Sequence, residues 1–190
     1  MRFKLQGLLA ITLLCAVGAS VFVAAAQRNK GQGSISSVYT NLTGCRTVSV
    51  DRESASYVER CAGIAGYKLD VETGDERMSI SVIAPGGKKS ELSYWQVITS
   101  AFSSLGNKAE WRVQKVGAKT VPVALIVRVN ASENPENPGK TTSYLAVAKI
   151  TPQRTCVTDK IAQGARANEE ARRAADSAAS KPCLEDTRQE

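Results

Sequence analysis

Apolar and polar residues alternate along much of the chain from Val38 onward, which is the pattern of half-buried β-strands. The alternation is clearest over residues 67–82, where it resumes in phase after Gly74-Asp75. A two-residue turn with glycine first is typical of a β-hairpin. This turn fixes the register, and the apolar pairs it predicts are Tyr67–Val82, Leu69–Ile80 and Val71–Met78. Asp70 and Glu72 fall on the opposite face, which is expected to be solvated.

A second hairpin is predicted around Glu53, because strand-like segments lie on both sides of the polar stretch 51–56. Pairing about Glu53 sets Cys45 directly opposite Cys61. Cross-strand neighbours lie about 4.5–5.5 Å apart, which is within the Cα–Cα range that a disulfide tolerates. The spacing therefore predicts a Cys45–Cys61 disulfide.

The segment from Tyr94 to Leu105 has the spacing of a helix instead of a strand. Ser93 with Gln96 fits a capping box, and Gly106 lies where a C-terminal cap belongs, so a short helix is predicted over 94–105. Strands are expected to resume at residues 109–116, 121–130 and 142–150. The last two are apolar on both faces in part, which favours central positions in a sheet.

The end of the chain predicts a strand over 156–162 followed by an alanine-rich helix. Asn168 is a good N-cap, the helix is expected to run to about Ser180, and Pro182 ends it. Its apolar face consists of small residues suited to close packing on a sheet: Ala171, Ala174, Ala175 and Ala178. Two ion pairs are expected on its solvent side: Glu169–Arg173 and Arg172–Asp176.

The last two cysteines are predicted to form a second disulfide. The strand and the helix are each about 20 Å long. If the helix turns back along the strand, Cys183 therefore returns to Cys156.

Together these elements predict a mainly β, antiparallel sandwich or curved sheet of seven or eight strands, with one short helix and a C-terminal alanine-rich helix. The predicted organisation is a signal peptide over 1–26, a flexible leader over 27–37, a β domain over 38–165, and a C-terminal helix and tail over 166–190. The second disulfide is expected to tie that tail to the β domain.

The N-terminus has the order of a secretory signal: Arg2 and Lys4, then the apolar run Leu8–Ala26, which ends in three alanines. The alternative is an uncleaved membrane anchor, since the run is just long enough to span a bilayer. Cleavage leaves four cysteines, an even set of the kind that forms disulfides in exported proteins. We therefore expect a periplasmic or secreted protein.

The chain carries a formal charge of +7, which falls to +5 when Arg2 and Lys4 are removed. This mild excess favours anionic surroundings without naming a ligand. The sequence has no block of like charges of the kind that forms a nucleic-acid-binding arm. After cleavage it has no apolar segment long enough to span a membrane. We therefore expect a monomer that binds an envelope protein or polymer and does not bind nucleic acid.

No catalytic or cofactor motif is present. The sequence has no histidine, which removes the commonest general base and zinc ligand, and a site of four cysteines would lack any CxxC spacing. No cofactor and no metal are therefore predicted. Paired carboxylates could still hydrolyse a glycosidic bond, and the candidates are Asp70, Glu72, Asp75, Glu76, Glu91 and Glu110.

Four residues suggest a binding surface: Tyr94, Trp95, Trp111 and Arg112. Aromatic side chains beside an arginine are enriched where surfaces hold partners. The alternative is that Trp95 and Trp111 are core residues that flank the predicted helix.

Several short motifs resemble a family of short exported bacterial proteins of uncharacterised function. They are Gly44-Cys45-Arg46, Arg60-Cys61-Ala62-Gly63, Gly66-Tyr67-Lys68-Leu69, Gly74-Asp75-Glu76-Arg77, 101–106 (AFSSLG) and Ala109-Glu110-Trp111-Arg112. The resemblance implies a bacterial periplasm and carries no activity. The leading hypothesis is an exported, non-enzymatic envelope protein that binds a protein or an anionic or saccharide polymer. The alternative is a weak carboxylate-based hydrolase of envelope polysaccharide.

Overall fold

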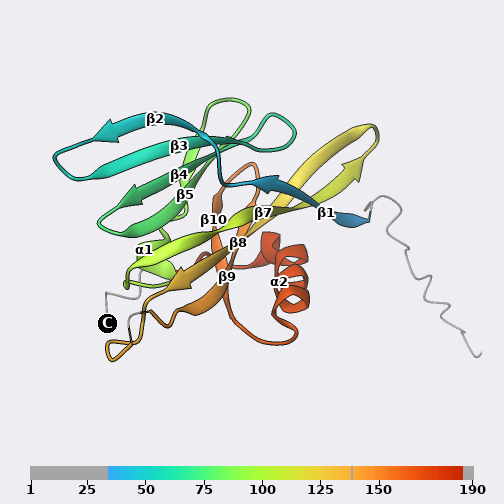
Figure 1. Ribbon diagram of the computed structural model, residues 1–190. Coiled ribbons are helices and arrows are strands. Elements are labelled where there is room, and N and C mark those ends of the chain that lie inside the picture. The colour runs from blue at the N-terminus through green and yellow to red at the C-terminus, as the bar shows by residue number, and fades with distance from the viewer. Residues whose placement is uncertain (1–33, 138, 186–190) are drawn as a thin grey trace, which may run out of the picture. The chain divides into compact units, whose positions relative to one another are not determined.

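Two antiparallel sheets of five strands each form the protein in the computed structural model, which describes residues 34–137 and 139–185 (Figure 1). Sheet 1 contains, in spatial order, β1 (Ile35–Asn41), β7 (Ser103–Val116), β8 (Lys119–Ala131), β9 (Thr142–Ile150) and β10 (Thr155–Ala162). Sheet 2 contains β2 (Arg46–Asp51), β3 (Ser56–Ala62), β4 (Lys68–Gly74), β5 (Arg77–Ile83) and β6 (Lys89–Glu91). The mainly β, antiparallel sandwich is confirmed, but the described residues form ten strands instead of the predicted seven or eight.

The predicted leader ends earlier than expected, because β1 begins at Ile35 and pairs with β7 from that residue onward. Residues 35–37 therefore belong to sheet 1. The predicted signal peptide, residues 1–26, and the first part of the leader lie outside the described residues.

The core lies between the two sheets, which face one another with their apolar sides. Sheet 2 contributes Leu69, Val71, Ile80 and Val82, and sheet 1 contributes Trp111, Val113, Leu125 and Val127, all of them buried. These positions alternate along their strands, as the period of two requires.

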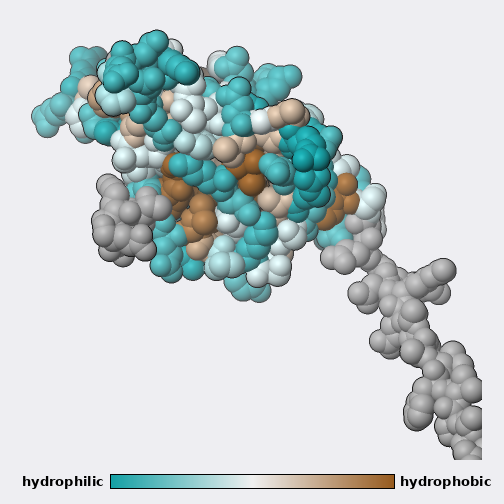
Figure 2. Space-filling model, turned by 90° about the horizontal axis from the view of Figure 1, so that it is seen from below, coloured by the Kyte–Doolittle hydropathy of each residue, from teal (hydrophilic) through white to brown (hydrophobic). Residues whose placement is uncertain are grey.

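The surface carries scattered apolar residues. Seen from below in Figure 2, they form separate patches among hydrophilic residues. Single exposed apolar side chains are normal on a soluble surface. Among the helices in the described ranges, none is both long enough and apolar enough to cross a membrane.

The hairpin of β4 and β5 is present, but its predicted register is wrong by two residues. Leu69 faces Val82 and Val71 faces Ile80, and the turn consists of Asp75 and Glu76, both with positive φ. A slip of two residues leaves every side chain on its original face, so the apolar pattern fits both registers equally well. Contacts from outside hold the observed turn, since Ser103 donates its N–H to the Glu76 carbonyl at 2.9 Å.

The outer face of this hairpin is not solvated as expected. Asp70 is 3% exposed. It accepts two hydrogen bonds from Arg60 on β3, at 2.7 and 2.8 Å. Ser79 and Ser81 are fully buried beside it. The cause is pairing within the sheet, since Arg60 pairs with Asp70 and Lys89 pairs with Glu72.

The first disulfide is confirmed. Cys45 and Cys61 are joined, with their Cα atoms 4.8 Å apart. The predicted pairing about Glu53 holds at this end of the hairpin, where Arg46 faces Arg60. A β-bulge between Thr47 and Ser49 then shifts the register by one residue towards the turn.

The helix predicted over 94–105 is wrong in length. α1 covers only Tyr94–Val97, and β7 begins at Ser103. Ser93 has a positive φ and makes no side-chain capping bond. Gly106 is no helix cap, since it lies within β7, where a Cβ would approach the Cβ of Arg128 to 2.9 Å. The backbone groups from Ser103 onward pair with β8 instead. This long strand pairing outweighs the local helical preference.

The C-terminal helix is present as α2 (Ala167–Asp176), followed by the 3-10 turn η1 (Ala178–Ser180). It begins before Asn168, with Arg166 at the cap position, so the predicted N-cap is wrong. Its alanine face packs on the outer face of sheet 1, where the buried cluster consists of Ala124, Ile126, Leu145, Val147, Ala167, Ala171, Ala175 and Ala178.

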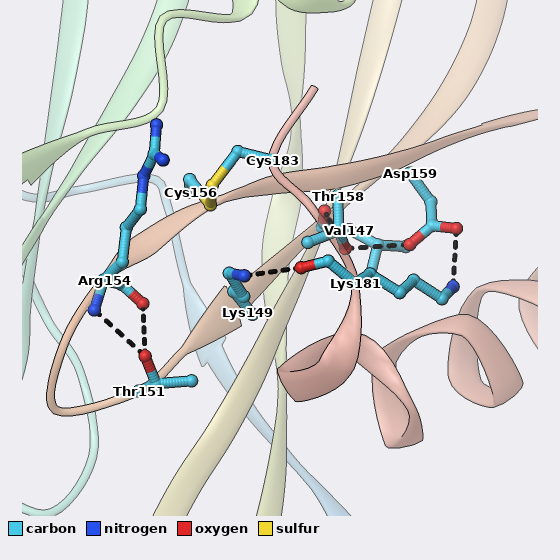
Figure 3. Close-up of a disulfide and its surroundings, with 9 residues drawn as sticks. All are labelled: Val147, Lys149, Thr151, Arg154, Cys156, Thr158, Asp159, Lys181 and Cys183. Atoms are coloured by element: carbon cyan, nitrogen blue, oxygen red, sulfur yellow. Dashed lines mark hydrogen bonds and ion pairs between the residues drawn. A yellow bond between two sulfur atoms is a disulfide. The ribbon is translucent and has the colours of Figure 1, made fainter. Parts of the chain in front are cut away.

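The second disulfide is confirmed as well (Figure 3). Cys156 on β10 and Cys183 are joined, with their Cα atoms 5.7 Å apart. Beside it, Lys149 donates to the Lys181 carbonyl at 2.5 Å, and the Lys181 ammonium lies 2.6 Å from the Asp159 carboxylate. Leu184 then donates its N–H to Val157 on β10 at 2.8 Å, so the tail is fastened along that edge strand.

Candidate functional site

The four residues predicted to form a binding surface do not come together. Tyr94 and Trp111 are both completely buried in the core between the sheets. The Trp111 indole donates to the Thr40 hydroxyl at 2.9 Å, and its ring lies 6.0 Å from that of Tyr67. These two are therefore core residues. The core alternative is correct for Trp111.

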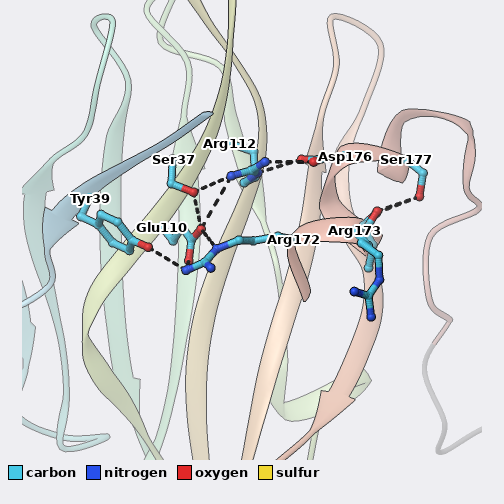
Figure 4. A network of polar contacts seen from close by, with 9 residues as sticks. Ser37, Tyr39, Glu110, Arg112, Arg172, Arg173, Asp176 and Ser177 are labelled. Carbon is cyan, nitrogen blue, oxygen red and sulfur yellow. Dashed lines mark hydrogen bonds and ion pairs between the residues drawn. The ribbon is translucent and has the colours of Figure 1, made fainter. Parts of the chain in front are cut away.

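Arg112 follows Trp111 on β7 and points to the opposite face of sheet 1, under α2 (Figure 4). It is 7% exposed. Its guanidinium donates to both carboxylate oxygens of Asp176 on α2, at 2.7 and 2.9 Å, and also to the Ser37 hydroxyl. Figure 4 shows these bonds, together with the contact of Arg112 to Glu110 at 3.9 Å. Arg112 therefore fastens α2 to the sheet.

A second arginine completes this ionic network. Arg172 on α2 donates to Glu110 on β7 at 2.7 Å and to the Tyr39 hydroxyl on β1 at 3.0 Å. Burial raises the pKa of Glu110, but the hydrogen bonds from Arg172 and Ser37 outweigh it and leave that pKa below its ordinary value. The Glu110 carboxylate in turn raises the pKa of Arg172. The expected Arg172–Asp176 pair is wrong, because both side chains reach the sheet instead. The Glu169–Arg173 pair is confirmed at 3.9 Å.

Of these four residues, Trp95 lines a groove, which also contains the carboxylate candidates Glu72 and Asp75. The groove has a volume of about 580 Å³ and lies at the end of sheet 2 nearest the β4–β5 turn. Its lining comes from β3, β4, the start of β5 and the segment that leads to sheet 1: Ser56, Tyr57, Val58, Glu72, Thr73, Gly74, Asp75, Arg77, Trp95 and Ser100. We call it the Trp95 groove.

The position of Trp95 follows from its neighbours in the chain. Tyr94 donates its N–H to the Ser79 hydroxyl at 3.0 Å and buries its ring in the core. The segment after it stays along the edge of β5, because Arg77 donates to the Ser100 carbonyl at 2.8 Å. Trp95 is thereby held next to β5 by a buried contact before it and an exposed one after it.

Gly74 leaves space at the bottom of the Trp95 groove. A Cβ at this position would meet the Ser56 Cβ at 3.4 Å, which is ordinary van der Waals contact. The backbone of Gly74 does not have a positive φ. A larger side chain here would therefore fill part of the groove without straining the strand.

The charged groups of the Trp95 groove are already paired. Glu72 accepts from the Ser81 hydroxyl at 2.7 Å and lies 2.8 Å from the Lys89 ammonium. Asp75 pairs with Arg77, whose guanidinium also lies 5.2 Å above the exposed ring of Phe102. The groove thus has no unpaired carboxylate, and its one lining cation is compensated.

A second hollow, of about 420 Å³, shares Ser100 with the Trp95 groove. In it Glu133 accepts from the Thr99 and Tyr144 hydroxyls, at 2.9 and 2.6 Å. Burial raises the pKa of Glu133, but these bonds and Lys160 leave it lowered, and the Glu133 bond raises the pKa of Tyr144 to about 12. Lys160 lies 4.0 Å above the Tyr144 ring.

Among the residues that line the groove, the sequence predicted Trp95 as a binding residue and Glu72 and Asp75 as carboxylate candidates, but it gave no reason to choose Tyr57 or Arg77. Tyr57 lies in a predicted hairpin strand and is 38% exposed, so its exposure could not be read from the alternation. Three or more acidic or cysteine side chains do not gather into a metal-binding group anywhere in ranges 34–137 and 139–185.

Comparisons with other proteins add no identity to this geometry. No family model, no curated protein and no solved structure matches the chain.

Proposed function

We propose that this chain is an exported, non-enzymatic protein of the bacterial cell envelope that binds a partner molecule in the Trp95 groove. The observation that carries the proposal is a groove of about 580 Å³ that is lined by Trp95 of α1 and by Tyr57 of β3, a strand that the Cys45–Cys61 disulfide braces. Its volume falls in the range of about 300–1,000 Å³ that is typical of ligand sites. Aromatic side chains with few rotatable bonds make strong anchors when the scaffold holds them in place.

An oxidising compartment supports the exported location. Both cysteine pairs of the described chain are joined, and disulfides persist in the periplasm and outside the cell. The signal-peptide pattern and the family resemblance point the same way.

Binding is favoured over hydrolysis by the state of the groove carboxylates. A glycosidase needs two carboxyl groups that are free to act on the bond. Glu72 is held by Lys89 and Ser81, and Asp75 is held by Arg77. A hydrolase would have to open one of these pairs before each turnover, whereas a binding site needs neither to move.

The test is retention of envelope material by the immobilised protein, with bound saccharide and peptide quantified by mass spectrometry. Gly74→Val should fill the groove and reduce retention, and Trp95→Ala should do the same. Val116→Ala is the matched control, because Val116 is 54% exposed and lies at the far β7–β8 turn. Equal retention by all four proteins would refute the groove. Release of reducing sugar that Glu72→Gln abolishes would support the hydrolase instead.

A further inference from the structure

We infer that the Trp95 groove binds an uncharged oligosaccharide chain, which continues past Ser100 into the second hollow. This inference rests on the proposed function and names its ligand. The two hollows share Ser100, and residues 98–101 line the second one. A ligand that occupies both must be an extended chain.

The pairing of charges excludes a charged ligand as the best fit. An anionic polymer would meet Glu72 and Asp75, and the one cation of the lining, Arg77, is compensated by Asp75. A basic peptide would find both carboxylates occupied, Glu72 by Lys89 and Asp75 by Arg77. If a basic peptide displaced Lys89 or Arg77, one ion pair would be exchanged for another, so the gain in binding free energy would be small.

The position of the groove disfavours an extended peptide. Peptides that add to a sheet pair with the backbone of an edge strand. The groove lies against β3 and β4, and each of these strands already pairs with a neighbour on both sides. The backbone groups of both strands are therefore occupied, so a peptide would leave its own backbone groups without the pairing that a strand edge supplies.

The remaining chemistry suits sugar rings. Trp95 and Tyr57 supply apolar faces on which the C–H face of a pyranose can stack, and Ser56 and Ser100 lie beside them. Ser56 already shares a hydrogen bond with Ser54 at 2.9 Å. A hydroxyl has one donor and two acceptor positions, so Ser56 retains capacity for a sugar hydroxyl.

The second hollow offers polar groups, since Thr99, Glu133 and Lys160 are among the residues that line it. Glu133 is fixed there by the Tyr144 hydroxyl, and Lys160 covers the Tyr144 ring. Lys160 is exposed. A chain that crosses Ser100 therefore finds aromatic contacts in the Trp95 groove and polar contacts in the second hollow, and its affinity should grow with its length.

The experiment is calorimetric titration of the full exported chain with uncharged oligomers of N-acetylglucosamine, of one, two, four and six units. Affinity should rise with length. Trp95→Ala should weaken binding of every oligomer by about tenfold or more. Lys160→Ala should weaken the four- and six-unit oligomers but leave the two-unit oligomer unchanged. Trp95→Phe should retain part of the binding, and Val116→Ala should bind as the unaltered protein does.

Each alternative result has a distinct meaning. Binding of tetralysine or of polyglutamate in a Trp95-dependent way, with no oligosaccharide binding, would overturn the saccharide inference and leave the proposed function intact. Oligosaccharide affinity that is independent of length, or equal losses at all lengths in Lys160→Ala, would overturn the extended site. If Trp95→Ala and Gly74→Val retain envelope material as well as the unaltered protein does, the proposed function fails as well.

Discussion

Replacing Arg112 with alanine should loosen α2 and destabilise the whole protein. The Arg112 side chain is 9% exposed and its partner Asp176 is 37% exposed, and two hydrogen bonds of 2.7 and 2.9 Å join them. Removing one member of a fully buried ion pair costs about 3–5 kcal/mol. Because water screens the more exposed Asp176, we expect a loss of about 2–3 kcal/mol in the free energy of unfolding.

The same helix supplies a matched control. Arg173 pairs with Glu169 at 3.9 Å, and both side chains are about two-thirds exposed, at 66% and 65%. Such a pair contributes about 0–1 kcal/mol. Arg173→Ala removes the same side chain and the same charge from the protein, so it separates the buried network from a general effect of net charge.

Urea denaturation monitored by circular dichroism measures both losses, and hydrogen exchange of the α2 amides locates them. Arg112→Ala should lower the melting temperature by about 5–10 °C, since about 1 kcal/mol corresponds to about 2–4 °C in a domain of this size. Its α2 amides should exchange faster than those of Arg173→Ala. In a double-mutant cycle Arg112→Ala and Asp176→Ala should be non-additive. Additive losses, or α2 exchange unchanged by Arg112→Ala, would refute the idea that this pair fastens the helix.

Two further predictions concern pH and the tryptophans. The pKa of Glu110 is lowered in the folded protein, so its contribution to stability is full above the unfolded value of about 4.5 and is lost as the pH falls through the lower folded value. Between pH 7 and pH 3 the melting temperature should therefore fall less steeply for Glu110→Gln than for the unaltered protein. Parallel curves would contradict this. Trp111→Ala should cost about 3–5 kcal/mol, because the ring is fully buried, whereas Trp95→Ala should cost under about 1 kcal/mol. Acrylamide should quench little of the fluorescence that remains in Trp95→Phe, and strong quenching would place Trp111 at the surface.

Both disulfides could be predicted because each depends on a local feature of the sequence. For the first it is the register of a hairpin, and for the second it is the length of two consecutive elements. Cys45 and Cys61 lie at the end of a hairpin where the pairing about Glu53 holds, and the bulge that shifts the register lies nearer the turn. Cys156 and Cys183 follow from a strand and a helix of similar length. Neither argument needs the sandwich to be known.

The turn at residues 75–76 and the true extent of α1 could not be predicted in the same way. Two registers of β4 and β5 satisfy the same apolar pattern, and the contact from Ser103 to Glu76 comes from a segment far along the chain. Residues 103–105 continue the helical spacing, yet they pair with β8 in sheet 1. In both cases tertiary contacts decide what local sequence leaves open.

The predicted binding cluster failed for a geometric reason. Trp111 and Arg112 are adjacent in the sequence, but successive residues of a strand point to opposite faces. One therefore enters the core and the other lies under α2. Trp95 is neither fully buried in the core nor covered by α2, because it lies on the short helix α1 at the edge of sheet 2. It is only partly buried there.

The two outer faces of the sandwich differ in a way that bears on function. α2 packs on β8, β9 and β10 and, with Arg112 and Arg172, occupies the outer face of sheet 1. The outer face of sheet 2 instead carries paired charges, Arg60 with Asp70 and Lys89 with Glu72, beside the Trp95 groove. Paired charges rigidify a face without apolar cover, because each carboxylate is already satisfied within the protein. The proposed binding site therefore lies next to charges that are paired with one another, whereas the outer face of sheet 1 is occupied by α2.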